Sequence, residues 1–64
     1  MSLKVSYDAD ANAAYIRLSG AKVMESEEVS PGVVFDFDTE GHIVGIELLD
    51  AKKQLSHDLL TAAA

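Results

Sequence analysis

Clusters of turn-forming residues divide the first fifty positions of this 64-residue chain into short segments. The clusters lie at 8–12, 19–20, 30–32 and 39–41 and are rich in Asp, Asn, Ser, Pro and Gly. These residues favour turns through side-chain hydrogen bonds or special backbone angles. The segments between the clusters have the usual length of β-strands. The spacing therefore predicts five strands, at Leu3–Tyr7, Ala13–Leu18, Lys22–Val29, Val33–Asp38 and Ile43–Leu49.

Apolar and polar residues alternate along several of these segments, as they do in a sheet that buries one face. In the first segment, Leu3, Val5 and Tyr7 alternate with Lys4 and Ser6. The third segment is the weakest of the five because Glu and Ser dominate it. It is expected to be an edge strand, whose charges discourage pairing with other chains.

The tail from Asp50 onward has helical character. Asp50 is expected to cap a turn at 51–54, and Ser56 is expected to cap a short helix at 57–63. An apolar stripe formed by Leu55, Leu59 and Leu60 would let this helix cover part of the sheet. The expected fold class is therefore α+β: an antiparallel β-meander of four to five strands with a short C-terminal helix. It would form one small domain over 1–64, with 51–64 as its helical tail.

The fourth and fifth segments form the clearest hairpin, around the turn at 38–42, and its register decides which face is buried. With Glu40-Gly41 as a two-residue turn, three apolar pairs share one face: Phe37 with Val44, Phe35 with Ile46, and Val33 with Leu48. The other face then carries Asp36 opposite Gly45 and Val34 opposite Glu47. A bulge at Gly41 would shift the pairing by one residue, so that Phe37 meets Ile43 and Val34 meets Ile46. Both faces would then be apolar and would need a second cover, such as a partner subunit, so the first register is preferred.

Composition excludes several classes of protein. The chain has no Cys, which excludes disulfides and thiolate metal sites. Its net charge is −6 and it has only 5 Lys and Arg, which argues against direct binding to nucleic acid or to a membrane surface. A basic protein partner remains compatible with this charge. A chain this small without a staple often gains stability by self-association, and a homodimer is the favoured assembly.

The sequence shows no signal peptide and no apolar run of about 20 residues, so a cytoplasmic location is expected.

Three carboxylates are the first candidates for chemistry. Asp36, Asp38 and Glu47 could lie near one another on the outer face of the hairpin, where paired carboxylates can perform acid–base work or hold a hard cation. The simpler interpretation is a solvated polar face on a sheet with one apolar side. His42 lies next to the turn and near Asp38, but no nucleophile is placed beside them, and a solvent-facing turn histidine is the simpler interpretation.

The remaining motifs have structural explanations. His57-Asp58 fits the polarity of a helix start, and the spacing of the two histidines matches no zinc site. The segment 8–12 resembles the start of a calcium loop but lacks its Gly and its terminal Glu, so a hairpin turn is expected. Gly45 inside a strand indicates a bulge or a close approach by another backbone or ring. Tyr7 and Tyr15 are expected to pack across strands with their hydroxyls at the rim.

Two blocks of the sequence resemble one family. The first is Tyr7-Asp8 followed by Ala14-Tyr15-Ile16-Arg17-Leu18, and the second runs from Phe35-Asp36-Phe37-Asp38 through Gly41 to Ile43–Ala51. Together they resemble domain of unknown function 2283, a family of small bacterial and archaeal proteins, over about residues 3–53. The resemblance implies a small antiparallel meander packed with a short helix and no established activity. Some members are associated with gene neighbourhoods that resemble toxin–antitoxin pairs. The family usually has Asp where this chain has Asn12, which puts a cation-binding role of that position in doubt.

The sequence therefore favours a small acidic interaction protein that is not an enzyme and needs no cofactor or metal. It is expected to self-associate and to bind a partner protein, as an acidic antitoxin binds a toxin. The second hypothesis is a module that binds a small ligand or divalent cation through Asp36, Asp38 and Glu47. A third is an enzyme assembled across a subunit interface from carboxylates or His42.

Overall fold

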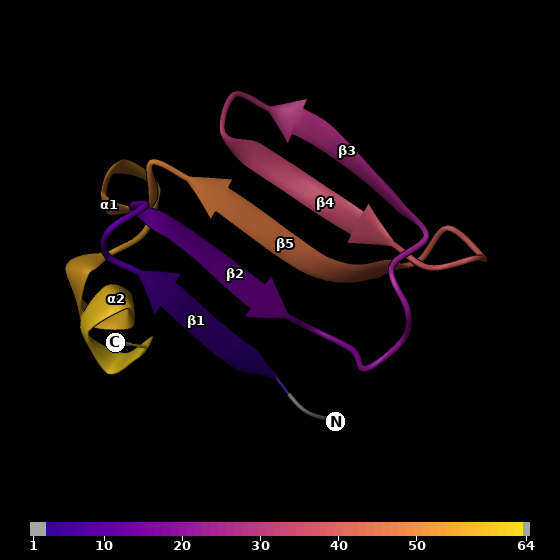
Figure 1. Ribbon diagram of the computed structural model, residues 1–64, viewed down its shortest axis with the longest axis horizontal. Helices are drawn as coiled ribbons and strands as arrows, with labels where there is room; N and C mark the ends of the chain where they lie inside the picture. The colour runs from indigo at the N-terminus through magenta and orange to yellow at the C-terminus, as the bar shows by residue number, and fades with distance from the viewer. Residues whose placement is uncertain (1–2, 64) are drawn as a thin grey trace.

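The computed structural model describes residues 3–63, which form one five-stranded antiparallel sheet and two short helices (Figure 1). The sheet order is β1-β2-β5-β4-β3. This confirms the expected α+β class with an antiparallel sheet and a helix at the C-terminus. The elements are β1 (Lys4–Asp8), β2 (Ala13–Arg17), β3 (Glu25–Ser30), β4 (Val33–Phe37), β5 (Ile43–Leu49), α1 (Ala51–Gln54) and α2 (His57–Ala63).

The strand order joins two sequential units through their longest strand. β1 and β2 form one hairpin, β3, β4 and β5 form a three-stranded meander, and β5 pairs with β2. β5 is thereby central, which suits its almost wholly apolar sequence, because a central strand is covered by neighbours on both edges. The glutamate-rich β3 lies at one edge, as the sequence predicted, and all of its residues are exposed. The two units are not brought together by a short turn. The strand order therefore depends on the long-range pairing of β2 with β5.

A side-chain oxygen holds the turn between β1 and β2. Asp8 Oδ1 accepts the backbone N–H of Asp10 at 3.0 Å and that of Ala11 at 3.3 Å, and Asn12 adopts a left-handed conformation with φ 51°. An aspartate that accepts the backbone N–H groups two and three residues further on is typical of tight turns. The segment 8–12 is therefore the hairpin turn that was expected there.

The β4–β5 register follows the preferred prediction over most of the hairpin and departs from it near the turn. Val33 pairs with Leu48, Phe35 with Ile46, and Asp36 with Gly45, as predicted. The predicted Phe37–Val44 pair is wrong: Phe37 pairs with Ile43, as in the alternative register, while Val34 keeps the preferred pairing with Glu47, and a β-bulge leaves Val44 as the extra residue. The carbonyl of Val44 instead accepts the N–H groups of Leu18 and Ser19. A bulge of this kind locally bends the strand and disrupts the ladder.

Strand alternation and register give the sheet two distinct faces. We call the one that carries the helices the helix face; its strand residues are Val5, Tyr7, Ala14, Ile16, Glu25, Glu27, Val33, Phe35, Phe37, Ile43, Ile46 and Leu48. We call the opposite one the carboxyl face; it includes Lys4, Ser6, Asp8, Ala13, Tyr15, Arg17, Ser26, Glu28, Val34, Asp36, Gly45, Glu47 and Leu49.

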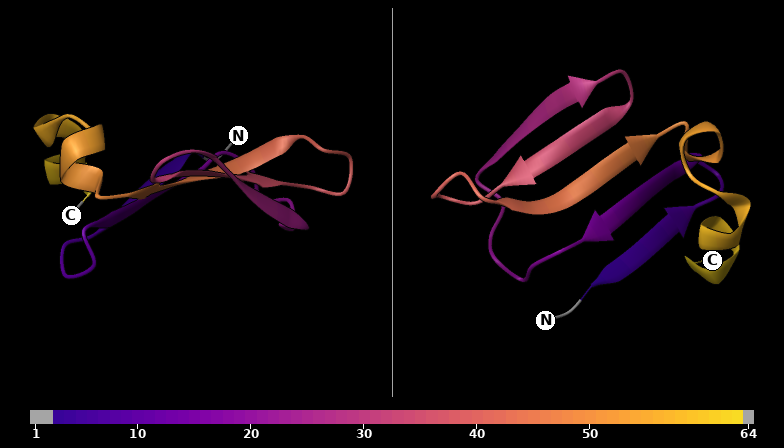
Figure 2. Two further views of the ribbon diagram at one scale, coloured as in Figure 1. Left: turned by 90° about the horizontal axis from the view of Figure 1, so that it is seen from above. Right: turned by 180° about the vertical axis from the view of Figure 1, so that it is seen from behind.

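The main buried cluster lies at one end of the helix face, and Val44, which is 2% exposed, is buried separately at the bulge. Ala14, Leu48, Ala51 and Leu60 form the main cluster, and partly buried apolar side chains, among them Leu55, pack against it. The edge view in Figure 2 shows both helices gathered over this end, while the rest of the sheet extends beyond them. The apolar stripe predicted for the tail thus contributes Leu60 and Leu55 to the core.

The expectation that Phe35 and Phe37 form the core is wrong. Both rings are only half-buried, and they contact each other edge to face with centroids 6.4 Å apart. The physical reason is length: α1 and α2 contain 4 and 7 residues, which at about 1.5 Å of rise per residue cannot reach across the sheet. The aromatic part of the helix face is therefore left without a covering layer.

The C-terminal helices match their predicted bounds, but the predicted cap of the first one is wrong. Asp50 has a left-handed backbone with φ 55° and makes no side-chain cap hydrogen bond. Its Oδ1 instead accepts Asn12 Nδ2 at 2.9 Å, and Asn12 Oδ1 accepts the N–H of Lys52 at 3.1 Å. The turn between β1 and β2 thus supplies the cap through tertiary contact. Within residues 3–63, neither helix has the length and apolar character needed to cross a membrane.

Candidate functional site

A row of side chains crosses the carboxyl face from one edge of the sheet to the other. The register places Lys4 beside Arg17, Arg17 beside Gly45, Gly45 beside Asp36, and Asp36 beside Ser26. All five strands contribute one residue. Asp36 thereby occupies the second-to-last position, on a strand with a neighbour on each side.

Asp36 is buried, which overturns the expectation of a wet and idle acidic face. Only 3% of its surface is exposed. Ser26 Oγ donates a hydrogen bond of 2.6 Å to its Oδ1 from the edge strand β3. Burying a carboxylate is costly unless hydrogen bonds replace water, and this short bond supplies part of that replacement. At Asp36 the carboxyl face therefore holds a buried, hydrogen-bonded carboxylate and not a solvated one.

Glu47 joins Asp36 from the neighbouring strand β5. Burial raises the pKa of Glu47 above its ordinary value, and the hydrogen bond to the Asp36 side chain and the negative charge of Asp36 raise it further. Burial and a neighbouring negative charge both disfavour ionisation, so Glu47 keeps its proton to higher pH than an isolated glutamate does. Of the three hypothesised acids, the structure thus brings Asp36 and Glu47 together.

Tyr15 covers the space left by Gly45. A Cβ atom built on Gly45 would overlap the Tyr15 hydroxyl and would lie 2.7 Å from its Cζ. The hydroxyl accepts a hydrogen bond of 3.1 Å from Arg17 Nη1, and Arg17 Nη2 donates one of 2.6 Å to the carbonyl of Ala21. Both predictions for Gly45 are confirmed, since it flanks the bulge and a ring approaches it closely. The Tyr15 hydroxyl lies inside the cluster, contrary to the expectation of a position at the rim.

Asp38 and His42 lie apart from this cluster, at the β4–β5 turn. Asp38 Oδ1 accepts the backbone N–H groups of Glu40 and His42, each at 2.9 Å. The N–H of His42 is the main cause that lowers the pKa of Asp38; burial opposes it, while the Glu40 N–H, the charge of His42 and the Gly41 N–H reinforce it. The His42 side chain is 73% exposed, and its Nδ1 is 3.7 Å from Asp38 Oδ2. His42 is therefore the solvent-facing turn histidine that was expected.

The other candidates have local roles. His57 Nε2 lies 3.3 Å from Thr61 Oγ1 within α2, and neither His57 nor Asp58 reaches the carboxyl cluster. Across residues 3–63, no three His, Asp or Glu side chains gather in an arrangement that could hold a metal ion. The three carboxylates of the second hypothesis are thus divided between a neighbouring pair, in which Asp36 is buried and Glu47 half-buried, and a turn.

The chemical capacity of this cluster is that Glu47 can hold a proton close to the hydroxyl groups of Tyr15 and Ser6. Glu47 borders an open hollow of about 310 Å³, whose wall also includes Tyr15, Ser6 and Leu49. Asp36, in contrast, is buried and engaged by Ser26. A carboxyl group with a raised pKa can donate a hydrogen bond, but a catalytic arrangement also needs a positioned nucleophile or substrate contact.

Sequence reasoning missed Ser26 and Arg17. Ser26 belongs to a segment that was interpreted only as an edge, and Arg17 only as a residue on the far side of its strand. Counting residue pairs back from the turn at 30–32 could have placed Ser26 beside Asp36. That count fails because a β-bulge makes Val29 an extra residue of β3. The β2–β5 pairing that brings Arg17 beside Gly45 has no local signal.

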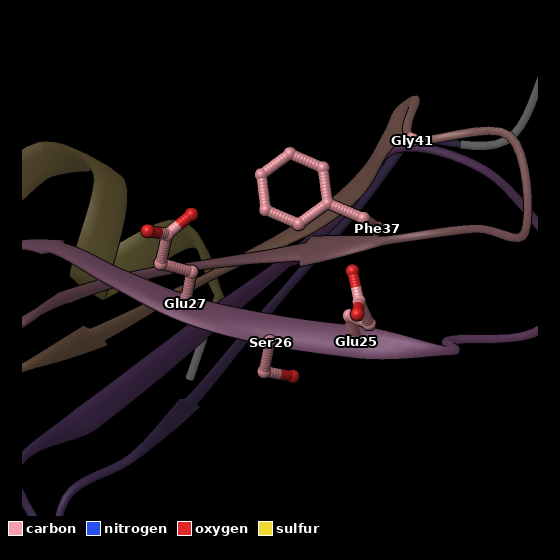
Figure 3. Close-up of a pocket in the computed structure, with 5 residues that line it drawn as sticks. All are labelled: Glu25, Ser26, Glu27, Phe37 and Gly41. Atoms are coloured by element: carbon pink, nitrogen blue, oxygen red, sulfur yellow. The ribbon is translucent and has the colours of Figure 1, made fainter.

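The helix face carries the second notable surface. Beyond the helices, the strand residues Ile16, Ile46, Phe35 and Phe37 are only half-buried, and Ile43 is 42% exposed. Figure 3 shows the Phe37 ring on the same side of β3 as Glu25 and Glu27, with Ser26 pointing to the other side. Together with Gly41, these residues line an open hollow of about 730 Å³ at the edge of the sheet. The aromatic surface is thus bordered by acids along β3.

These features define a small α+β protein with one twisted antiparallel sheet, a buried aspartate beside a half-buried glutamate on one face, and an apolar face that is only partly covered. The chain belongs to the family described as protein of unknown function (DUF2283), whose profile matches residues 4–52. An uncharacterised protein of Methanocaldococcus jannaschii is 33% identical over 58 residues, which cover 91% of this chain and 49% of that protein. The chain thus spans about half the length of this relative. No solved structure matches it significantly.

Proposed function

We propose that this protein is a non-enzymatic interaction module that acts through the open part of the helix face. The observation that carries this proposal is the apolar surface of the helix face, where Phe35 and Phe37 are only half-buried and Ile43 is 42% exposed, next to the partly buried Ile16 and Ile46. Contiguous exposed apolar surface on a small protein marks a site of protein contact, because leaving it in water is unfavourable.

The distribution of negative charge indicates where a basic protein partner would bind. Glu25, Glu27 and Glu28 are all exposed on the edge strand β3, within a chain of net charge −6. A basic protein would be steered to this margin, in the way an acidic antitoxin meets a basic toxin. The module is therefore proposed to self-associate and also to bind a basic protein partner.

The geometry does not favour the hypothesis of a cation or small-ligand site made of three acids. Asp38 is engaged by the backbone of its own turn, and Asp36 is closed off by Ser26. A hard cation needs several oxygen ligands that face one open point. We therefore place the function on the helix face.

Site-specific photo-crosslinking in living cells tests this function. A photoreactive phenylalanine analogue at Phe37 reports on the helix face, and the same analogue at Leu49 is the matched control, since Leu49 is 49% exposed on the carboxyl face. Covalent adducts identified by mass spectrometry are expected from position 37 and not from position 49. A probe at position 37 that gives no protein adduct above the control would refute the proposal.

A further inference from the structure

We propose that the open part of the helix face is covered by a second copy of this chain, so that two sheets pack face to face as a β-sandwich. This inference rests on the proposed function, because it names the occupant of the same surface. Four observations favour a second copy over an unrelated partner: the missing layer, the twist, the distribution of charge and the size of the core.

The first observation is the missing layer. The protein measures 33 × 27 × 17 Å, and away from the helices it is one sheet thick (Figure 2). Its accessible surface is 4400 Å². This is close to the roughly 4,000 Å² expected for a compact monomer of this mass. The missing layer is therefore indicated by the single-sheet thickness and by the half-buried phenylalanines. Stable domains bury an apolar sheet face against a second layer.

The second observation is the twist of the sheet. Every sheet of L-residues twists in the same sense, and two similar twisted sheets pack at about 10 Å with their strands roughly aligned. A second copy has the same twist as the first, because the two sheets are identical. The helices stand at one end of the face, so they bound the overlap of the two sheets without blocking it.

The third observation is the distribution of charge. Within the strands, the charged residues of the helix face are Glu25 and Glu27, and both lie on the edge strand β3. The centre of the face, formed by Ile16, Ile46 and Phe35, is uncharged. Two copies can therefore meet at their centres with the acids at the solvated margin. A basic partner would instead find complementary charge only at one edge.

The fourth observation is the size of the buried core. Two of the four residues in the buried cluster are alanines, Ala14 and Ala51, which bury little apolar surface. Chains of this length without disulfide or metal usually need further stabilisation, and assembly is one source of it. Covering the phenylalanines and isoleucines with a second copy would supply that burial.

Sedimentation equilibrium on the purified full chain tests this inference. The wild type is expected to show a mass of twice 6.8 kDa, or 13.6 kDa, at micromolar concentration. The variant Ile43→Lys places a charge on the helix face at a residue that is already 42% exposed, so that its fold is spared. It is expected to weaken dimerisation roughly tenfold or more, because an unpaired charge would enter the interface.

Leu49→Lys is the matched control, since it adds the same charge at a similarly exposed residue of the same strand on the opposite face. It is expected to leave the dimer intact, and circular dichroism checks that both variants are folded. A wild type that stays monomeric up to millimolar concentration would overturn the inference. So would a dimer that Leu49→Lys dissociates, or one that Ile43→Lys leaves unchanged. If the wild type is monomeric while position 37 still crosslinks to another protein in cells, the interaction function survives and only the second copy is ruled out.

Discussion

The two faces of this sheet reverse what their compositions suggest. The helix face is apolar, yet Phe35 and Phe37 on it are only half-buried and Ile43 is 42% exposed. The carboxyl face is polar, yet Asp36 on it is 3% exposed, about as little as the buried core residues. In a single-layer sheet, the burial of a residue depends on which neighbouring side chains can cover it. Gly45 leaves room for Tyr15, while on the other face short helices leave the phenylalanines uncovered.

The largest expected effect tests the small core on the covered end of the helix face. Leu60→Ala removes a side chain that is 5% exposed and lies in the buried cluster. The loss of buried surface and the resulting cavity are expected to lower the free energy of unfolding by about 3 kcal/mol. Chemical denaturation followed by circular dichroism measures this loss. A change below about 1 kcal/mol would mean that α2 contributes little to the core.

The next effect tests the packing on the carboxyl face. Gly45→Ala introduces a Cβ that overlaps the Tyr15 ring, which must then leave its position and its hydrogen bond to Arg17. The expected loss is about 2 kcal/mol of unfolding free energy, a typical cost of overpacking. Gly20→Ala is the control, because nothing lies within 4 Å of that position, and it should be nearly neutral. Equal effects of the two substitutions would contradict the close contact at Gly45.

The smallest effect tests the carboxyl pair through pH. The raised pKa of Glu47 means that the folded state holds this proton more tightly than the unfolded chain does. The stability from this proton is complete below the ordinary glutamate pKa and is lost as the pH rises through the higher pKa of the folded state. Glu47→Gln keeps the side chain neutral, so its Tm should exceed that of the wild type at pH 7.

Thermal melts of Glu47→Gln between pH 4 and pH 7 measure this difference, which should shrink toward pH 4. Glu28→Gln is the control, because Glu28 is exposed on the same face, on the edge strand β3 beyond β4. It should show no such trend in the difference from wild type. A Glu47→Gln variant that is less stable than the wild type at pH 7 would show that the pair is needed in its ionised form.

The elements of the fold could be predicted from sequence because their signals are local. The bounds of Ile43–Leu49 and of both helices were recovered, since alternation, turn residues and the tail pattern act over a few positions. Near the β4–β5 turn the prediction failed, because the Val44 bulge depends on hydrogen bonds from Leu18 and Ser19. A contact between segments so far apart in the chain leaves no trace in local periodicity.

The candidate site was predicted only in part, for the same reason. Asp36 and Glu47 were proposed as neighbours from the hairpin register, and the structure places their side chains close together. The burial of Asp36 was not predicted, because its hydrogen-bond partner Ser26 comes from β3 and because Tyr15 of β2 lies over Gly45, the residue paired with Asp36. The separation of Asp38 was also missed, since the strand ends at Phe37 and the turn backbone engages the Asp38 side chain.

The sequence by itself determined where the chain turns, which segments extend and which residues share a strand face, because these depend on backbone angles and a two-residue period. The tertiary structure decided that β5 lies at the centre, that a carboxyl group is closed from water and that aromatic rings are left near the surface. The physical reason is that burial is a property of the assembled sheet and of the reach of its helices. No single segment can specify what will lie over it.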